Sequence, residues 1–188
     1  MRVIDFEIGT SIWDLNLNGD FGRLKDTTPI VLEEEVSVNY KADLGAIELP
    51  LCSFIWISQA AAIITGVKTS PHPNPLGVND VIALLTKLQQ QLDDSGWENV
   101  ELNDVTRKEL TGESETLDSL SGRDFGEWRV PGSKLAVHVR RLLNADTFKV
   151  GCHFYDHAVF EKAYNIAMDR REKNGDISKR LPLAEWKP

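Results

Sequence analysis

The sequence predicts an α+β fold in which antiparallel strands form one or two meanders and two principal helices pack on the sheet. Several segments alternate apolar and polar residues with the period of two that is typical of a half-buried strand. Two later segments carry apolar residues at helical spacing, and each ends near a glycine. Turn-forming residues separate successive strands by short distances, which favours antiparallel pairing.

The chain is expected to begin with a strand. The segment VIDFEIG (3–9) alternates apolar with acidic residues, as a half-buried strand does. Ser11 and Asp14 form a capping pair for at most one turn of helix, which would carry Trp13. Residues 16–29 are rich in turn formers and are expected to be a loop.

Residues 31–67 predict three more strands. The segment VLEEEVSVNYK (31–41) is expected to be one strand with a wet face that includes Glu33 and Glu35. Strands around 46–51 and 54–67 should follow. The uncharged run that contains both approaches the length of a membrane span, but its β-branched and aromatic content favours buried strands. We therefore expect no membrane insertion.

Two helices are predicted. The first should begin near Asn79, and Asn79 or a neighbouring residue would be its N-cap. It should end in a Schellman motif with Gly96 at C′ and Trp97 at C″. The second should run from about 157 to Lys173 after an N-cap at Asp156. The apolar stripe of the first helix consists of Val78, Val81, Ile82, Leu85, Leu88 and Leu92.

The last third of the chain predicts a second meander. The segments FGEWRV (125–130), KLAVHVRRL (134–142) and FKVGCHF (148–154) read as three strands joined by turns. Both parts of the chain thus consist of strands followed by a helix, without detectable sequence identity. At 188 residues we expect a single compact domain over 1–188, with a soft division near 103–125.

The charge distribution favours a basic protein as partner. The formal net charge is −8, which argues against a nucleic-acid partner. Residues 1–133 hold 10 Lys and Arg against 22 Asp and Glu, whereas the remainder holds 11 against 7. A polar, acidic stretch within 103–125 is expected to be a long loop that either is solvated or docks a partner. The candidate partner-binding residues are Glu113, Glu115, Asp118, Asp124 and Trp128.

Tryptophan adds candidate anchors for such a partner. The chain has five, and we expect Trp56 and Trp97 to be structural. Trp13, Trp128 and Trp186 fall at the edges of predicted elements, where they would suit a partner surface. In size, acidity and lack of a catalytic motif the chain is similar in general terms to bacterial immunity proteins, which block toxin enzymes. That resemblance implies a non-enzymatic inhibitor; a purely structural or oligomerising module is the alternative.

A second alternative is a metal-binding or hydrolytic domain that uses His138, His153 and His157. A two-residue turn at Ala145-Asp146 would pair His138 with His153 across a hairpin. Three histidines brought together in this way are the ligand set of many zinc sites. The cluster would equally suit a pH-sensitive or anion-binding surface.

Other signals point away from an enzyme. The chain contains no phosphate-binding loop, no dinucleotide-binding glycine motif and no nucleophile-elbow or zinc-protease motif, so we expect no cofactor. Cys52 and Cys152 are expected to be buried free thiols. The start MRVIDFEIG lacks the apolar stretch of a signal peptide, which predicts a cytoplasmic protein unless a signal was removed before this start.

Overall fold

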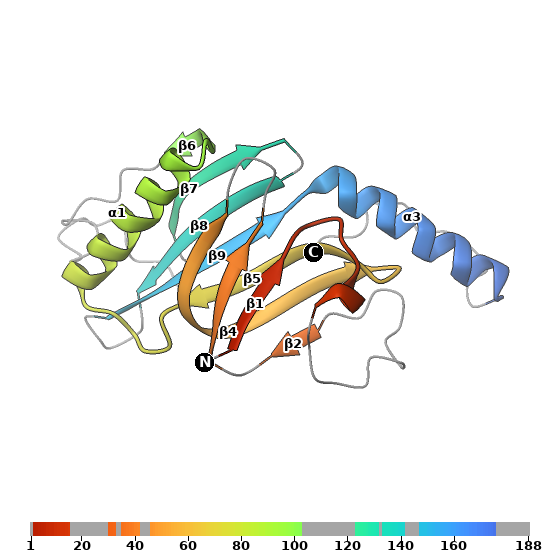
Figure 1. Cartoon of the computed structure of the whole chain (residues 1–188), viewed down its shortest axis with the longest axis horizontal. Coiled ribbons are helices and arrows are strands. Elements are labelled where there is room, and N and C mark those ends of the chain that lie inside the picture. Colours follow the sequence, from red (N-terminus) through yellow and green to blue (C-terminus); the bar gives the residue numbers. More distant parts are fainter. Residues whose placement is uncertain are drawn as a thin grey trace.

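The computed structural model describes residues 2–15, 30–32, 35–41, 46–102, 123–131, 133–141 and 147–175; for residues 101–102, 123–125, 133 and 137–141 it describes the backbone alone. This part of the chain forms a mostly antiparallel sheet of nine strands with two helices packed on it, which confirms the predicted α+β class (Figure 1). The strands are β1 (Arg2–Phe6), β2 (Ile30–Leu32), β3 (Val36–Tyr40), β4 (Ile47–Ala60), β5 (Ile63–Pro71), β6 (Glu98–Leu102), β7 (Arg123–Val130), β8 (Ser133–Arg141) and β9 (Phe148–Tyr155). The helices are α1 (Val78–Asp94) and α3 (His157–Lys173), and a 3-10 helix, η1 (Ile12–Asp14), follows β1.

The sheet contains two meanders whose last strands are adjacent. The strand order is β1-β3-β4-β5-β9-β8-β7-β6, and β2 pairs with β4. Strands β5 and β9 are antiparallel, with Gly66 opposite Tyr155. The first meander, β3-β4-β5, leads into α1, and the second, β7-β8-β9, leads into α3. The two parts thus share the order of their elements along the chain, while the single-domain interpretation of the whole chain stays a prediction.

One pairing departs from the antiparallel pattern. Strand β1 is parallel to β3, with Arg2 opposite Val36. Parallel neighbours need a long crossover, and residues 7–35 between the two strands are long enough to supply it. The chain therefore returns to the same edge of the sheet in the same direction.

The single strand expected over 31–41 consists of two strands, β2 and β3. Both lie along the same edge of β4, with Leu32 opposite Ile55 and Val36 opposite Cys52. Strand β1 covers the outer edge of β3. Among the described strands, none covers the outer edge of β2.

The break expected near residue 52 is absent, because β4 runs without interruption from Ile47 to Ala60. The hairpin turn to β5 falls instead at Ala61 and Ala62, whose φ angles are 52° and 66°. Two-residue hairpins with positive φ normally use asparagine and glycine. The sequence QAAAI carries neither, so local turn signals could not reveal this turn.

The C-terminus of α1 and the N-terminus of α3 agree with the predicted capping. The N–H of Trp97 donates to the Leu92 carbonyl at 2.9 Å and the N–H of Gly96 to the Asp93 carbonyl at 3.1 Å, which are the two bonds of a Schellman motif. Asp156 caps α3 by accepting from the Val159 N–H at 2.8 Å. The N-cap of α1 is Gly77, two residues before the expected Asn79.

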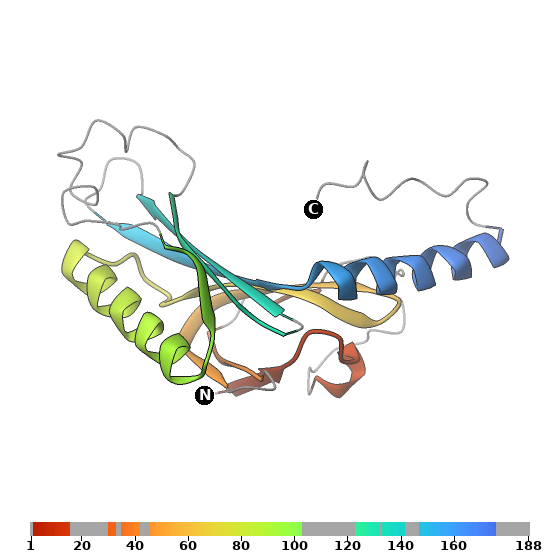
Figure 2. The same ribbon diagram turned by 90° about the horizontal axis from the view of Figure 1, so that it is seen from above.

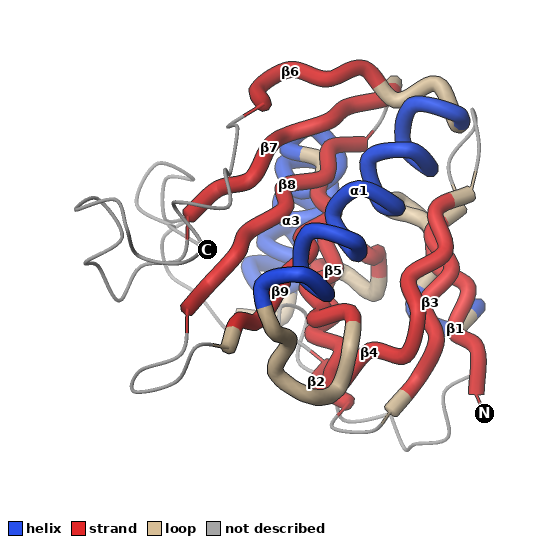
Figure 3. The backbone as a smooth tube through the Cα atoms, turned by 90° about the vertical axis from the view of Figure 1, so that its left-hand side faces the viewer, coloured by secondary structure: helices blue, strands red, loops and turns tan. Residues whose placement is uncertain are grey.

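The main core lies on the face of the sheet that α1 covers (Figures 2 and 3). The buried side chains of α1 are Val81, Leu85, Leu88 and Leu92. An aromatic cluster connects the two meanders, because Phe154 of β9 stacks on Tyr40 of β3 with ring centroids 4.5 Å apart. Phe6 and Trp97 contact the same pair of rings at distances of 5.0 to 6.4 Å.

The second helix, α3, packs on a smaller apolar cluster. Its buried residues are Ala163, Tyr164, Ala167 and Met168, and they meet Ala60 and Ala61 at the tip of the β4-β5 hairpin. Figure 1 shows α1 and α3 at opposite ends of the molecule's long axis. The two helices therefore stabilise different parts of the sheet.

Candidate functional site

The face of the sheet opposite the main core, called here the outer face, carries the candidate site. Strand alternation directs Ile55, Val67 and Phe154 into the core, and all three are buried. Their neighbours of opposite parity define the outer face. These are Phe54, Trp56, Gly66, Lys68, Glu127, Arg129, Lys134, His153 and Tyr155.

Three large apolar side chains remain exposed together on the outer face, and we call them the outer apolar patch. Val31 of β2 is 44% exposed and lies directly opposite Trp56 of β4, which is 41% exposed. Phe54, two residues from Trp56 on the same strand, is 37% exposed. Exposed tryptophan and phenylalanine side chains that lie close together are typical of protein-docking surfaces.

Charged residues border the patch on two sides. Lys68 of β5 lies opposite Trp56 on the side away from β2. On the β2 side the sequence continues as Glu33, Glu34 and Glu35, and Glu35 is exposed. Glu35 thus lies three residues after Leu32, the last residue of the strand whose outer edge no described strand covers.

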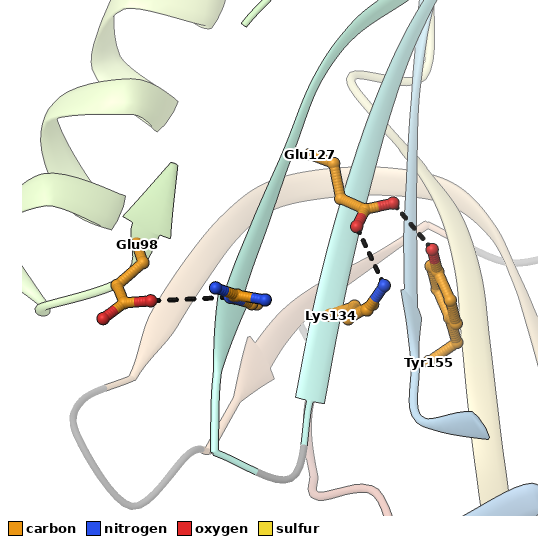
Figure 4. A network of polar contacts seen from close by, with 5 residues as sticks. Glu98, Glu127, Lys134 and Tyr155 are labelled. Carbon is orange, nitrogen blue, oxygen red and sulfur yellow. Dashed lines mark hydrogen bonds and ion pairs between the residues drawn. The ribbon is translucent and has the colours of Figure 1, made fainter. Parts of the chain in front are cut away.

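A network of paired polar side chains occupies the other half of the outer face (Figure 4). The Tyr155 hydroxyl donates to Glu127 Oε2 at 2.8 Å, and Lys134 Nζ donates to Glu127 Oε1 at 3.1 Å. Lys134 Nζ also lies 5.9 Å from the centre of the Tyr155 ring. Arg129 pairs with Glu98 of the edge strand β6 at 3.4 Å. These contacts connect β6 to β7, and β7 to both β8 and β9.

The network holds Glu127 in its ionised form. Partial burial by itself would raise the pKa of this carboxyl group. Hydrogen bonds from Tyr155 and Lys134, together with the charges of Lys134 and Arg129, outweigh the burial and lower the pKa below its ordinary value. Both carboxylate oxygens have protein partners, so the geometry suits a cross-strand clamp.

The histidines do not have the predicted register. His138 lies opposite Gly151, and Ala136 lies opposite His153, so the expected pairing of His138 with His153 is wrong by two residues. His153 lies against Tyr155 with ring centroids 4.9 Å apart, and His157 is exposed at the start of α3. Among the described side chains, no group of three or more His, Cys, Asp or Glu is placed to hold a metal ion; the side chain of His138 lies outside them.

Gly66 of β5 allows close packing against β9 beside His153. A Cβ atom at this position would lie 3.1 Å from the Phe154 carbonyl oxygen and 3.6 Å from His153 Nε2. The distance to the carbonyl oxygen is shorter than most Cβ contacts in proteins. The glycine therefore lets β5 and β9 approach at the junction of the two meanders.

The predicted partner-binding residues have two different outcomes. Trp128 is completely buried in the core, so it cannot anchor a partner, and this prediction is wrong. Glu113, Glu115 and Asp118 lie outside the described residues, as does the side chain of Asp124.

The burial of the tryptophan side chains differs in part from the expectation. Trp97 is buried, as predicted for a structural residue, but Trp56 is exposed on the outer face. Trp13 of η1 is 58% exposed, and Trp186 lies outside the described residues. The sequence does not reveal the exposure of Trp56, because its neighbours in SFIWIS are apolar on both faces of the strand.

The two cysteines are buried free thiols, as predicted. Burial raises the pKa of Cys52 to about 11 despite a hydrogen bond with Thr69, and burial with the nearby Cys52 also raises the pKa of Cys152. Neither thiol is poised as a nucleophile at neutral pH.

The comparisons with known proteins return no relative. No protein-family model matches the chain, and neither a curated protein nor a solved structure matches it. In the described part of the chain, neither helix has the length and apolar character needed to cross a membrane.

Proposed function

We propose that this chain is a non-enzymatic binding protein that docks on a basic protein and neutralises it, as an immunity or inhibitor protein does. The outer apolar patch is the centre of the docking surface. The observation that carries this proposal is the exposure of Val31, Phe54 and Trp56 together on one sheet face.

Burial of the patch by a partner would supply the affinity. Tryptophan is among the side chains that most often dominate the energy of an interface. The charge of −8 would supply the approach, because an acidic surface attracts a basic protein over distances of about a Debye length. The predicted acidic loop residues Glu113, Glu115 and Asp118 would add to this attraction.

Affinity capture from the source organism's lysate tests the proposal when Trp56→Ala is compared with the intact chain. We expect the intact chain to retain a basic protein that mass spectrometry identifies, and that binds again after purification. Trp56→Ala should weaken this binding by about 2 kcal/mol, or roughly thirtyfold. If the retained protein is an enzyme, the intact chain should inhibit it.

Trp13→Ala is the matched control, since Trp13 is the more exposed tryptophan but lies on η1 instead of the sheet. It should bind like the intact chain. Equal binding by Trp56→Ala would show that the outer apolar patch is not the docking surface. Binding that does not weaken with added salt would contradict the proposed role of the negative charge.

A further inference from the structure

The uncovered edge of β2 adds a second feature to the outer apolar patch. Strands β2 and β3 follow one another along the same edge of β4, but β1 covers only β3. No described strand pairs with the outer edge of Ile30–Leu32. An edge of this kind presents the backbone N–H and C=O groups of alternate residues to any further strand.

The side chains of β2 indicate what such a strand would contain. Val31 is exposed on the outer face, while Ile30 is buried and Leu32 is half-buried at the margin of the core. An added strand would place one row of side chains beside Val31 and the other row beside Ile30 and Leu32. Both rows would meet apolar surface, so the added strand should be apolar at its centre.

The charge next to β2 indicates which molecule supplies the added strand. Glu35 is exposed, and the sequence places Glu33 and Glu34 between it and β2. A second copy of this chain would bring its own exposed Glu35 to the same edge, and like charges disfavour that pairing. A segment with lysine or arginine at its ends meets the opposite charge.

We infer that the basic partner adds an extended segment, apolar at its centre and basic at its ends, as a new strand on the outer edge of β2. This inference rests on the proposed function, because it specifies how the partner uses the outer apolar patch. The backbone of the added strand pairs with β2, and its side chains cover Val31 on the side away from Trp56.

The probe is a short peptide with a valine and isoleucine centre and lysines at both ends. Hydrogen exchange on the intact chain should show slower exchange of the amides of Ile30–Leu32 when the peptide binds. The same peptide with alternate backbone amides methylated should bind roughly tenfold more weakly, because it loses interstrand hydrogen bonds. The counterpart with glutamate ends should not bind.

Two valine variants locate the site. Val31→Lys should weaken peptide binding roughly tenfold, since it puts a like charge on the edge of β2. Val3→Lys is the matched control, because Val3 is an exposed valine on a different edge strand, β1, and this variant should bind like the intact chain. Melting curves of the variants check that both are folded.

The outcomes separate this inference from the proposed function. Equal binding of the methylated peptide, unchanged exchange at residues 30–32, or the absence of any peptide binding overturns strand addition. If the captured partner still depends on Trp56 in that case, the proposed function stands and only the mode of docking is wrong. Dimerisation of the intact chain that Val31→Lys abolishes would make a second copy the occupant, and would also overturn the inference.

Discussion

Strands β3, β4 and β5, which lead into α1, and strands β7, β8 and β9, which lead into α3, form two units with the same order of elements along the chain; they meet at the β5-β9 pair, although α3 packs on the β4-β5 hairpin of the first unit. Their outer faces differ in chemistry. In the second unit, Glu127, Lys134 and Tyr155 pair with one another across three strands. In the first unit, Trp56 and Phe54 lie exposed beside Val31 of β2.

This difference separates a face that stabilises itself from one that does not. The polar network connects β6, β7, β8 and β9, so its groups already have partners within the chain. The outer apolar patch gains stabilisation only when another surface removes it from water. We therefore assign docking to the first unit and a structural role to the network of the second.

The largest effect is expected where the two units are joined. Phe154→Ala removes a ring that contacts Phe6, Tyr40 and Trp97, and it should lower the free energy of unfolding by about 3–5 kcal/mol. Denaturant titration measures this loss. Phe54→Ala is the matched control on the outer face, and it should change the stability by less than about 1 kcal/mol. Similar losses from both variants would show that the patch is part of the core.

The polar network should have a smaller, pH-dependent effect. Glu127→Gln should lower the free energy of unfolding at neutral pH by roughly 1 kcal/mol, because the ionised carboxylate is the acceptor of the clamp. The folded pKa of Glu127 is lowered, so its stabilising contribution is present above the unfolded pKa of about 4.5 and is lost as the pH falls through the folded pKa. The two chains should therefore converge in stability in acid.

Glu98→Gln is the control for this titration. The pair that Glu98 forms with Arg129 is largely exposed, and such pairs contribute less than about 1 kcal/mol. A pH profile of Glu127→Gln that runs parallel to that of the intact chain would contradict the role of Glu127 in the clamp.

The hairpin turns of the two units should respond differently to glycine. Ala62 has a positive φ of 66°, which strains an L-residue, whereas the β7-β8 turn has the sequence Pro131-Gly132. Ala62→Gly should raise the free energy of unfolding by about 0.5–1 kcal/mol, since relief of strain exceeds the entropy that glycine adds to the unfolded chain. Thermal melting measures the gain, and a lower melting temperature would contradict the strained turn.

The smallest effect is expected from oxidants. Each unit buries one thiol, but β5 lies between Cys52 and Cys152, which separates their Cα atoms by more than about 9 Å at the usual strand spacing. A disulfide needs a separation below about 7 Å. The folded chain should therefore form no internal disulfide with diamide, and its thiols should react with a thiol reagent only after unfolding. Fast labelling in the native state would contradict this burial.

The features that could be predicted depend on neighbours in the chain. Asp156 caps α3 and the Gly96-Trp97 pair ends α1 through bonds that span a few residues, so the residues themselves signal them. The alternation in VIDFEIG likewise identifies a strand and its buried face. The α+β class follows from these local patterns added together.

Only the tertiary structure decided where these elements meet. The parallel pairing of β1 with β3, the β5-β9 junction and the alignment of His138 with Gly151 depend on contacts between distant segments, for which a single sequence carries no local signal. The same holds for Trp56 and Trp128, because both lie in strands with apolar or mixed neighbours and only the packing shows that one is exposed and the other buried. Local hydrogen bonding therefore determined the elements of this protein, while the burial of their faces against one another determined which residues remain available to a partner.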